Sequence, residues 1–135
     1  MDPEVQELFD AAKAVQANAY APYSAFRVGA AVRAASGRIY AGCNVENAAY
    51  PQGACAETGA ISAMVAAGER TITAVLTFCD GTELSTCCGG CRQRIREFAG
   101  PDTPVYAAGS DGSLVAFTLD SLLPAAFGPR NLARK

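Results

Sequence analysis

The chain has 135 residues, with 50% hydrophobic residues, 18% charged residues and a formal net charge of −2. This balance excludes an intrinsically disordered chain, and the length predicts a single domain over residues 1–135. No cluster of Lys and Arg is large enough to neutralise many phosphates, which argues against a nucleic acid as partner.

The sequence predicts no membrane segment. Its apolar runs are about ten residues or shorter, and a span of the bilayer needs ~20. The first ten residues, MDPEVQELFD, are acidic, whereas a secretory signal begins with a basic segment. We therefore expect a cytoplasmic protein. In that reducing compartment, its six cysteines favour metal binding or catalysis over a disulfide framework.

The first third of the chain is expected to form a helix and a hairpin. An Asp-Pro pair is typical of a helix start, and apolar residues recurring at helical spacing then predict a helix over residues 3–19. Alternating apolar residues predict a strand over 26–32, which turns at a Ser-Gly pair and returns over 38–45. Residues 46–54 contain Pro and Gly, which predict a loop.

The rest of the chain is expected to alternate helices and strands. Residues 71–79 are β-branched and almost wholly apolar, which predicts a central strand covered on both faces. The other predicted elements are a helix from Cys55 to Gly68, a loop with Gly81, a helix from Cys88 to Phe98, strands near 103–108 and 113–118, and a short helix that meets Pro124. Their order predicts an α/β fold with one mixed sheet of five strands. Residues 128–135 are expected to be a flexible tail.

Three thiols are placed to share one metal ion. Cys88 and Cys91 are separated by two residues at a predicted helix start, a spacing that lets two thiolates bind one Zn²⁺. Cys55 supplies a third thiolate from another helix start. Three protein ligands with an open fourth position are typical of catalytic zinc. We therefore expect one Zn²⁺ per chain, with water in the open position.

Glu57 is the candidate general acid–base group. Side chains two positions apart in a helix interior point about 200° apart, so Glu57 and Cys55 can meet only at the open end of the helix. A carboxylate beside metal-activated water can take its proton and pass it to a leaving group. The alternative reading of Glu57 is a favourable charge at a helix N-terminus, worth about 0.3–1 kcal/mol.

The other cysteines leave a second reading of the zinc site open. A structural zinc with four thiolates could use Cys79 or Cys87, although adjacent cysteines seldom share a metal. Cys43 and Cys79 lie in predicted strands, where cysteine is more often a small buried hydrophobic residue. Three thiolates on Zn²⁺ carry a net charge of −1, which the two helix N-termini offset in part.

The residues resemble the small cytidine deaminase family over about residues 5–127. CAE at residues 55–57 and CGGCRQ at residues 88–93 resemble the two zinc motifs of that family. The stretches APYSAFRVGAAV, GCNVENAAYP and LLPAAF occur in the family's order and spacing. The resemblance implies a three-layer α/β/α sandwich and a homotetramer with shared active sites.

The resemblance also implies a nucleoside site. Phe26 would line it, the Asn44 amide and the Glu46 carboxylate would bind the ribose 3′-hydroxyl, and the main chain of Ala56 would hold the base. The alternatives are that Phe26 is a core aromatic residue and that Asn44 caps a strand end.

Two further site residues would come from neighbouring subunits. These are Tyr50 and Phe127, with Phe127 stacking on the base. Catalysis would then require the tetramer. The alternative for Phe127 is again a core aromatic residue.

The activity implied is hydrolytic deamination of cytidine and deoxycytidine to uridine and deoxyuridine in pyrimidine salvage. Zinc-bound hydroxide would attack C4 of the cytosine ring, while Glu57 protonates N3 and later the departing amine. The close alternative is the same chemistry on a modified cytosine nucleoside, blasticidin S or an N4-substituted cytidine. Two further alternatives are a deaminase that edits polynucleotides and a non-catalytic zinc module.

Two positions depart from the family's pattern. The family usually has an arginine directly after CAE, whose guanidinium bonds the cysteine sulfurs, and here that position is Thr58. It usually has proline directly before the CxxC, and here that residue is Cys87. We hypothesise that the Thr58 hydroxyl, or a guanidinium from Arg92 or Arg94, replaces part of the missing interaction.

Overall fold

The computed structural model describes residues 1–80 and 83–132. Its elements follow the predicted order. The first helix ends at Gln16, whereas the sequence predicted an end near residue 19. Gly81 and residues 133–135 of the expected tail lie outside the described residues. The elements are α1 (Pro3–Gln16), β1 (Val28–Ala34), β2 (Ile39–Cys43), η1 (Tyr50–Gln52), α2 (Ala56–Ala66), β3 (Ile72–Cys79), α3 (Gly89–Phe98), β4 (Pro104–Gly109), β5 (Leu114–Thr118), α4 (Leu119–Leu122) and η2 (Pro129–Leu132).

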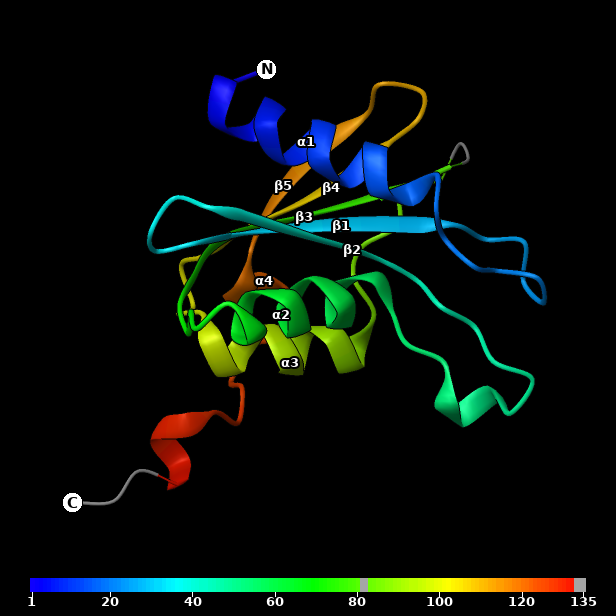
Figure 1. Cartoon of the computed structure of the whole chain (residues 1–135). Helices are drawn as coiled ribbons and strands as arrows, with labels where there is room; N and C mark the ends of the chain where they lie inside the picture. Colours follow the sequence, from blue (N-terminus) through cyan, green and yellow to red (C-terminus); the bar gives the residue numbers. More distant parts are fainter. Residues whose placement is uncertain (81–82, 133–135) are drawn as a thin grey trace.

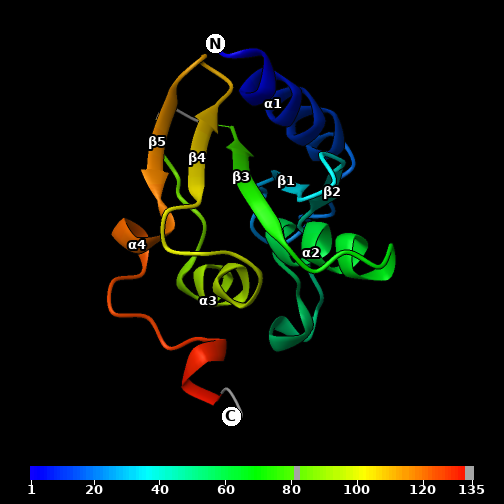
Figure 2. The same ribbon diagram turned by 90° about the vertical axis from the view of Figure 1, so that its left-hand side faces the viewer.

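The five strands form one mixed sheet in the order β2-β1-β3-β4-β5. β3 is the central strand, as its apolar sequence predicts (Figure 2). It pairs antiparallel with β1 and parallel with β4, and the outer pairs β1–β2 and β4–β5 are antiparallel. Because β1 runs opposite to both β2 and β3, the strands β2 and β3 point in the same direction. Their carboxyl ends therefore lie at the same edge of the sheet.

The helices cover both faces of this sheet, which confirms the three-layer α/β/α sandwich. α1 lies on one face, and α2 and α3 lie side by side on the other (Figure 1). The core under α1 includes Leu8, Leu76 and Phe78. The core under α2 and α3 includes Met64 and Ile95. No helix among the described residues is both long and apolar enough to cross a bilayer.

α2 packs unusually close to the edge strand β2. A Cβ atom built on Gly42 would lie 2.6 Å from the carbonyl oxygen of Ala56 and 2.7 Å from the carbonyl carbon of Gly59, with the backbone nitrogen of Ala60 in contact as well. Real Cβ atoms do not approach backbone atoms this closely, so only glycine at this position lets the helix backbone rest on the strand. Gly42 therefore sets the depth at which the first turn of α2 lies.

Replacing this glycine should move α2. We expect Gly42→Ala to lower the free energy of unfolding by about 1–3 kcal/mol, because the clash is with backbone atoms that cannot rotate away. Denaturant unfolding measures the change. Gly100→Ala is the control, since a Cβ there has no neighbour within 4 Å and its effect should stay within about 0.5 kcal/mol. Equal stability of the two variants would contradict the close approach.

Candidate metal centre

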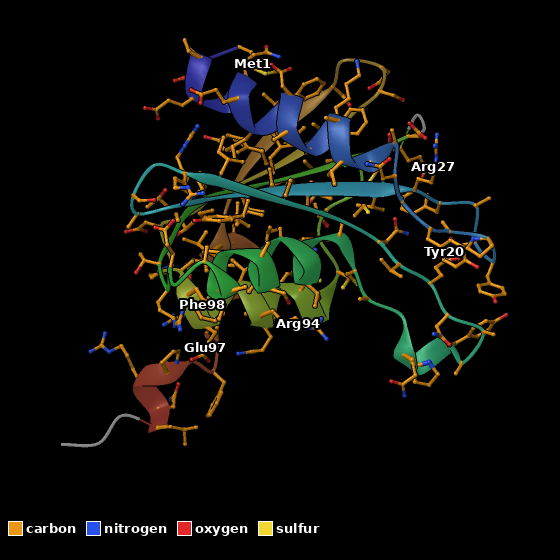
Figure 3. The ribbon with its side chains drawn as sticks, in the orientation of Figure 1. Met1, Tyr20, Arg27, Arg94, Glu97 and Phe98 are labelled. Atoms are coloured by element: carbon orange, nitrogen blue, oxygen red, sulfur yellow. The ribbon has the colours of Figure 1, made fainter. Side chains whose placement is uncertain are left out.

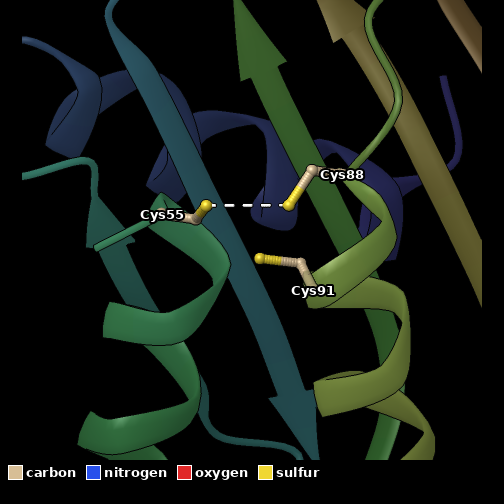
Figure 4. A group of neighbouring side chains, drawn as sticks. All are labelled: Cys55, Cys88 and Cys91. Atoms are coloured by element: carbon tan, nitrogen blue, oxygen red, sulfur yellow. Dashed lines mark hydrogen bonds between the residues drawn. The ribbon is translucent and has the colours of Figure 1, made fainter. Parts of the chain in front are cut away.

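The topology brings two helix starts together. α2 follows β2 and α3 follows β3, so both helices begin at the edge where the carboxyl ends of these strands lie. Cys55 is the N-cap residue of α2 and Cys88 is the N-cap residue of α3. Neither side chain makes a capping hydrogen bond, so both sulfurs are free to point elsewhere. Figure 4 shows that they point toward each other and toward Cys91 in the first turn of α3.

The three sulfurs are spaced for one tetrahedral ion. The Sγ atoms of Cys55 and Cys88 are 3.7 Å apart, and all three Sγ atoms lie within 4.8 Å of one another. A tetrahedral Zn²⁺ with sulfur at ~2.3 Å would separate two sulfurs by about 3.8 Å. The chain has no histidine, and among the described residues no further Cys, Asp or Glu joins this cluster. The donor set therefore fits zinc with three protein ligands.

The surroundings of the three thiols shift their pKa values in different directions. Burial raises the pKa of Cys55 and of Cys91. At Cys88 burial also raises the pKa, but hydrogen bonds from the Cys91 backbone and from the neighbouring thiols outweigh it, so that this pKa lies below its usual value. Because only thiolates bind zinc, loading of the site releases protons.

The other cysteines lie outside the cluster. Cys87 precedes Cys88 but is buried in the core under α2 and α3, and burial followed by the charge of Glu57 raises the pKa of Cys87 to about 11. Burial raises the pKa of Cys79 to about 11 as well. Both behave as buried protonated thiols rather than as metal ligands. The described residues thus give no support to the four-thiolate alternative.

Glu57 is a buried carboxyl group beside the three sulfurs. It lies in the first turn of α2, two residues after Cys55, and is 3% exposed. Burial raises its pKa, and a hydrogen bond from Thr77 and the charge of Arg94 oppose that rise. The helix start brings Glu57 and Cys55 to one place, as the sequence predicts. A carboxyl with a raised pKa is suited to exchanging protons near neutral pH.

Thr77 is a site residue that sequence reasoning missed. Its hydroxyl, on the central strand β3, donates a hydrogen bond of 3.5 Å to Oε2 of Glu57, and its side chain is 2% exposed. A signal was present in the sequence, because Thr77 interrupts the apolar run of β3 with a polar side chain. Burying a hydroxyl is unfavourable unless it finds a partner, and Glu57 is that partner.

A pocket of about 260 Å³ opens beside Cys55, Cys88 and Glu57. It is lined by four of the residues predicted to bind substrate, which are Phe26, Asn44, Glu46 and Ala56. The fold thus brings together predicted residues from the segment before β1, the segment after β2 and the first turn of α2. Ser85 and Thr86, which were not predicted, line the same pocket from the segment before α3.

Asn44 and Glu46 also hold one wall of this pocket in place. The Asn44 side chain accepts a hydrogen bond of 2.9 Å from the Val28 N–H and donates one of 2.8 Å to the Phe26 carbonyl. The Glu46 carboxylate accepts hydrogen bonds from the hydroxyl and the backbone N–H of Ser24 and from the Tyr23 N–H. The Ser24 hydroxyl contributes most to lowering the pKa of Glu46, with burial opposing it, so this carboxylate is ionised at neutral pH.

Tyr50 and Phe127 lie apart from the metal cluster within one chain. Tyr50 is 74% exposed on η1, where its ring centroid is 5.8 Å from that of Tyr23. Phe127 is 56% exposed after α4, and its carbonyl accepts a hydrogen bond of 2.8 Å from Gln93. Neither residue lines the described pocket beside the sulfurs. The reading of Phe127 as a core aromatic residue is wrong, because its side chain is exposed.

The three residues proposed to support the sulfurs differ in where they reach. The Thr58 hydroxyl lies 3.9 Å from Sγ of Cys91, and an Arg94 nitrogen donates to the same sulfur at 3.8 Å. Arg92 does not do so, because its guanidinium is occupied elsewhere. It donates to the carbonyls of Cys87 and Leu122, each at 2.9 Å, and to the Thr86 hydroxyl at 2.7 Å.

Comparisons with known proteins agree with this geometry. A family model described as the cytidine and deoxycytidylate deaminase zinc-binding region matches residues 3–108. The chain is 40% identical over 130 residues to a cytidine deaminase from Sporosarcina psychrophila, which covers 96% of each protein. A crystal structure of cytidine deaminase from Burkholderia pseudomallei matches with a TM-score of 0.86 and 39% identity, over 90% of this chain and 98% of that one. The cytidine deaminase from Mycobacterium tuberculosis matches with a TM-score of 0.81 and 34% identity, over 94% and 99%.

Neighbouring cysteines should differ sharply in metal binding. We expect one zinc per wild-type chain by elemental analysis. Cys88→Ala should lose this zinc, because it removes a sulfur of the cluster, whereas Cys87→Ala should keep it, because Cys87 lies in the core. Loss of zinc from the folded Cys87→Ala variant would show that the ligand set has been assigned wrongly.

Proposed function

The chain belongs to the cytidine deaminase family, and we propose that this zinc-dependent hydrolase converts free cytidine and deoxycytidine to uridine and deoxyuridine with release of ammonia. The observation that carries the proposal is one pocket lined by Cys55, Cys88 and Glu57, with Cys91 completing the sulfur cluster. The same pocket is lined by Phe26, Asn44, Glu46 and Ala56, which are expected to bind a nucleoside. Its role in the cell would be pyrimidine salvage.

Zinc held by the three cysteines supplies Lewis acidity, which lowers the pKa of a water molecule toward neutrality. Glu57 takes a proton from the attacking water and delivers it to N3 of the cytosine ring, while the water oxygen bonds to C4. Glu57 then takes the remaining proton from the new C4 hydroxyl group and gives it to the amine, which leaves as ammonia as the C4 carbonyl forms. The balance is cytidine plus water to uridine plus ammonia.

The chain holds Glu57 ready for both transfers. Burial excludes bulk water from the carboxyl group and raises its pKa, which helps it keep a proton between the two steps. The Thr77 hydroxyl is directed at Oε2. The other carboxyl oxygen is then available to the reacting groups, and the orientation of the carboxyl group is fixed before substrate arrives.

Recognition of the nucleoside is assigned to the residues around the rest of the pocket. The Asn44 amide and the Glu46 carboxylate would bind the ribose 3′-hydroxyl, Phe26 would lie against the nucleoside and the Ala56 main chain would hold the base. All four line the pocket. A carboxylate that is ionised at neutral pH is a strong acceptor for a sugar hydroxyl. Both cytidine and deoxycytidine carry the 3′-hydroxyl, so this contact does not separate them.

We assign Tyr50 and Phe127 to the active sites of neighbouring subunits in a homotetramer. The support is their exposure, since large aromatic side chains that are 74% and 56% exposed are typical of surfaces that another chain covers. The Phe127 ring would stack on the base across the subunit boundary. We place the enzyme in the cytoplasm, because a centre of three thiolates needs a compartment that keeps thiols reduced.

Deamination should be visible directly in ultraviolet absorbance, which falls as cytidine becomes uridine. We expect turnover of cytidine and deoxycytidine, loss of activity with a zinc chelator and its return on adding zinc. Glu57→Gln should bind zinc yet lose at least ~100-fold in kcat, because the amide cannot carry a proton. Absence of turnover by the zinc-loaded protein would overturn the assignment. A higher kcat/KM on blasticidin S than on cytidine would instead favour the modified nucleoside.

Shared active sites predict recovery of activity in mixed tetramers. Phe127→Ala and Glu57→Gln should each be impaired alone, but co-expression should restore function to about a quarter of the sites, where an intact Glu57 meets an intact Phe127. Glu57→Gln with Cys55→Ala is the matched control, because both changes affect the part of the site within one chain. Recovery in the control pair, or none in the test pair, would contradict sharing.

A further inference from the structure

The charge of the metal centre needs a cation near the sulfurs. Three thiolates and one Zn²⁺ sum to −1, and the buried Glu57 adds further negative charge when it is ionised. The N-termini of α2 and α3 each offer about half a positive charge. That offset is partial and comes from dipoles rather than from a full charge. A side-chain cation close to a sulfur would stabilise both the thiolates and the bound metal.

Among the described residues, Arg94 brings its guanidinium group to the sulfur cluster. Its Nη1 atom lies 3.8 Å from Sγ of Cys91, which is the most deeply buried of the three sulfur ligands. Arg92, two residues earlier, is engaged with two carbonyl oxygens and a hydroxyl. Figure 3 shows Arg94 on α3, in the helical layer opposite α1.

A glycine makes room for this contact. Gly90 lies four residues before Arg94 on α3, and side chains at this spacing share one helix face. A Cβ atom on Gly90 would lie 3.1 Å from Nη1 of Arg94, the same nitrogen that contacts Cys91. This is tighter than an ordinary van der Waals contact, so an added methyl group would shift the guanidinium by a few tenths of an ångström. The adjacent Gly89 has open space around its Cβ position.

We propose that Arg94 is a positioning residue that neutralises the zinc centre, and that Gly90 provides the space through which its guanidinium reaches Cys91. Thr58 completes the arrangement from α2, where its hydroxyl faces the same sulfur at 3.9 Å. The inference rests on the proposed zinc site, and it assigns the charge compensation to α3. Arg94 is an exposed residue, so solvent screens part of its charge. We therefore expect an effect at the low end of the range known for residues that support metal ligands.

Zinc affinity tests this role without relying on turnover. We expect Arg94→Gln to weaken zinc binding roughly tenfold in competition with a chromogenic chelator, with unchanged thermal stability of the metal-free protein. Arg94→Lys should lie closer to wild type, because it restores the charge. Gly90→Ala should weaken binding by less than Arg94→Gln, and Gly89→Ala should match wild type. The two alanine variants change helix propensity similarly, so their difference isolates the displaced guanidinium.

Two results would overturn the inference. Wild-type zinc affinity in Arg94→Gln would remove Arg94 from the metal centre. Equal zinc affinity in Gly90→Ala and Gly89→Ala would remove Gly90 from the arrangement. Neither result would bear on the proposed activity, which the turnover of cytidine by the wild-type protein tests separately.

Discussion

The structure depends on concentrating negative charge at two helix N-termini. Three sulfur ligands and a carboxyl group lie within the first turns of α2 and α3 or at their caps. In an apolar core these groups would be expensive to bury as anions. At helix starts they meet unpaired N–H groups and favourable dipoles, and a bound Zn²⁺ would offset two of the three thiolate charges. The chemistry is therefore located where the fold tolerates it best.

The sheet order makes this concentration geometrically available. β2 and β3 point the same way although β1 lies between them, so the helices that follow them start at one edge. Gly42 then lets α2 rest on the backbone of β2, which fixes the height of Cys55 and Glu57 relative to α3. β3 contributes Thr77, whose hydroxyl donates a hydrogen bond to the Glu57 carboxyl group. The side chains of the centre are thus supported by both the sheet and the helical layer on its α2–α3 face.

Much of this could be predicted because it depends on local patterns. Short stretches of sequence show that Cys88 and Cys91 are separated by two residues and that Glu57 follows Cys55 closely. A nearly continuous apolar run predicts that β3 is the central strand. The end of α1 was less predictable, since apolar residues continue past Gln16 into a turn. The sequence did not predict which of Arg92 and Arg94 contacts a sulfur ligand, because that depends on the three-dimensional structure. Both follow Cys91 closely, but the Arg92 guanidinium donates to the Leu122 carbonyl, which is distant in sequence, whereas the Arg94 guanidinium stays beside the Cys91 sulfur. Thr77 was missed because its partner is 20 residues away in sequence.

The hydrogen bonds of Glu46 have a further consequence for ligand entry. This carboxylate already fastens the segment at Tyr23 and Ser24, and Asn44 fastens the backbone at Phe26 and Val28. The segment that would contact the sugar is therefore already ordered before the ligand binds. The conformational entropy of this segment is lost when the chain folds and not when the ligand binds. More of the free energy of the ligand contacts therefore contributes to affinity.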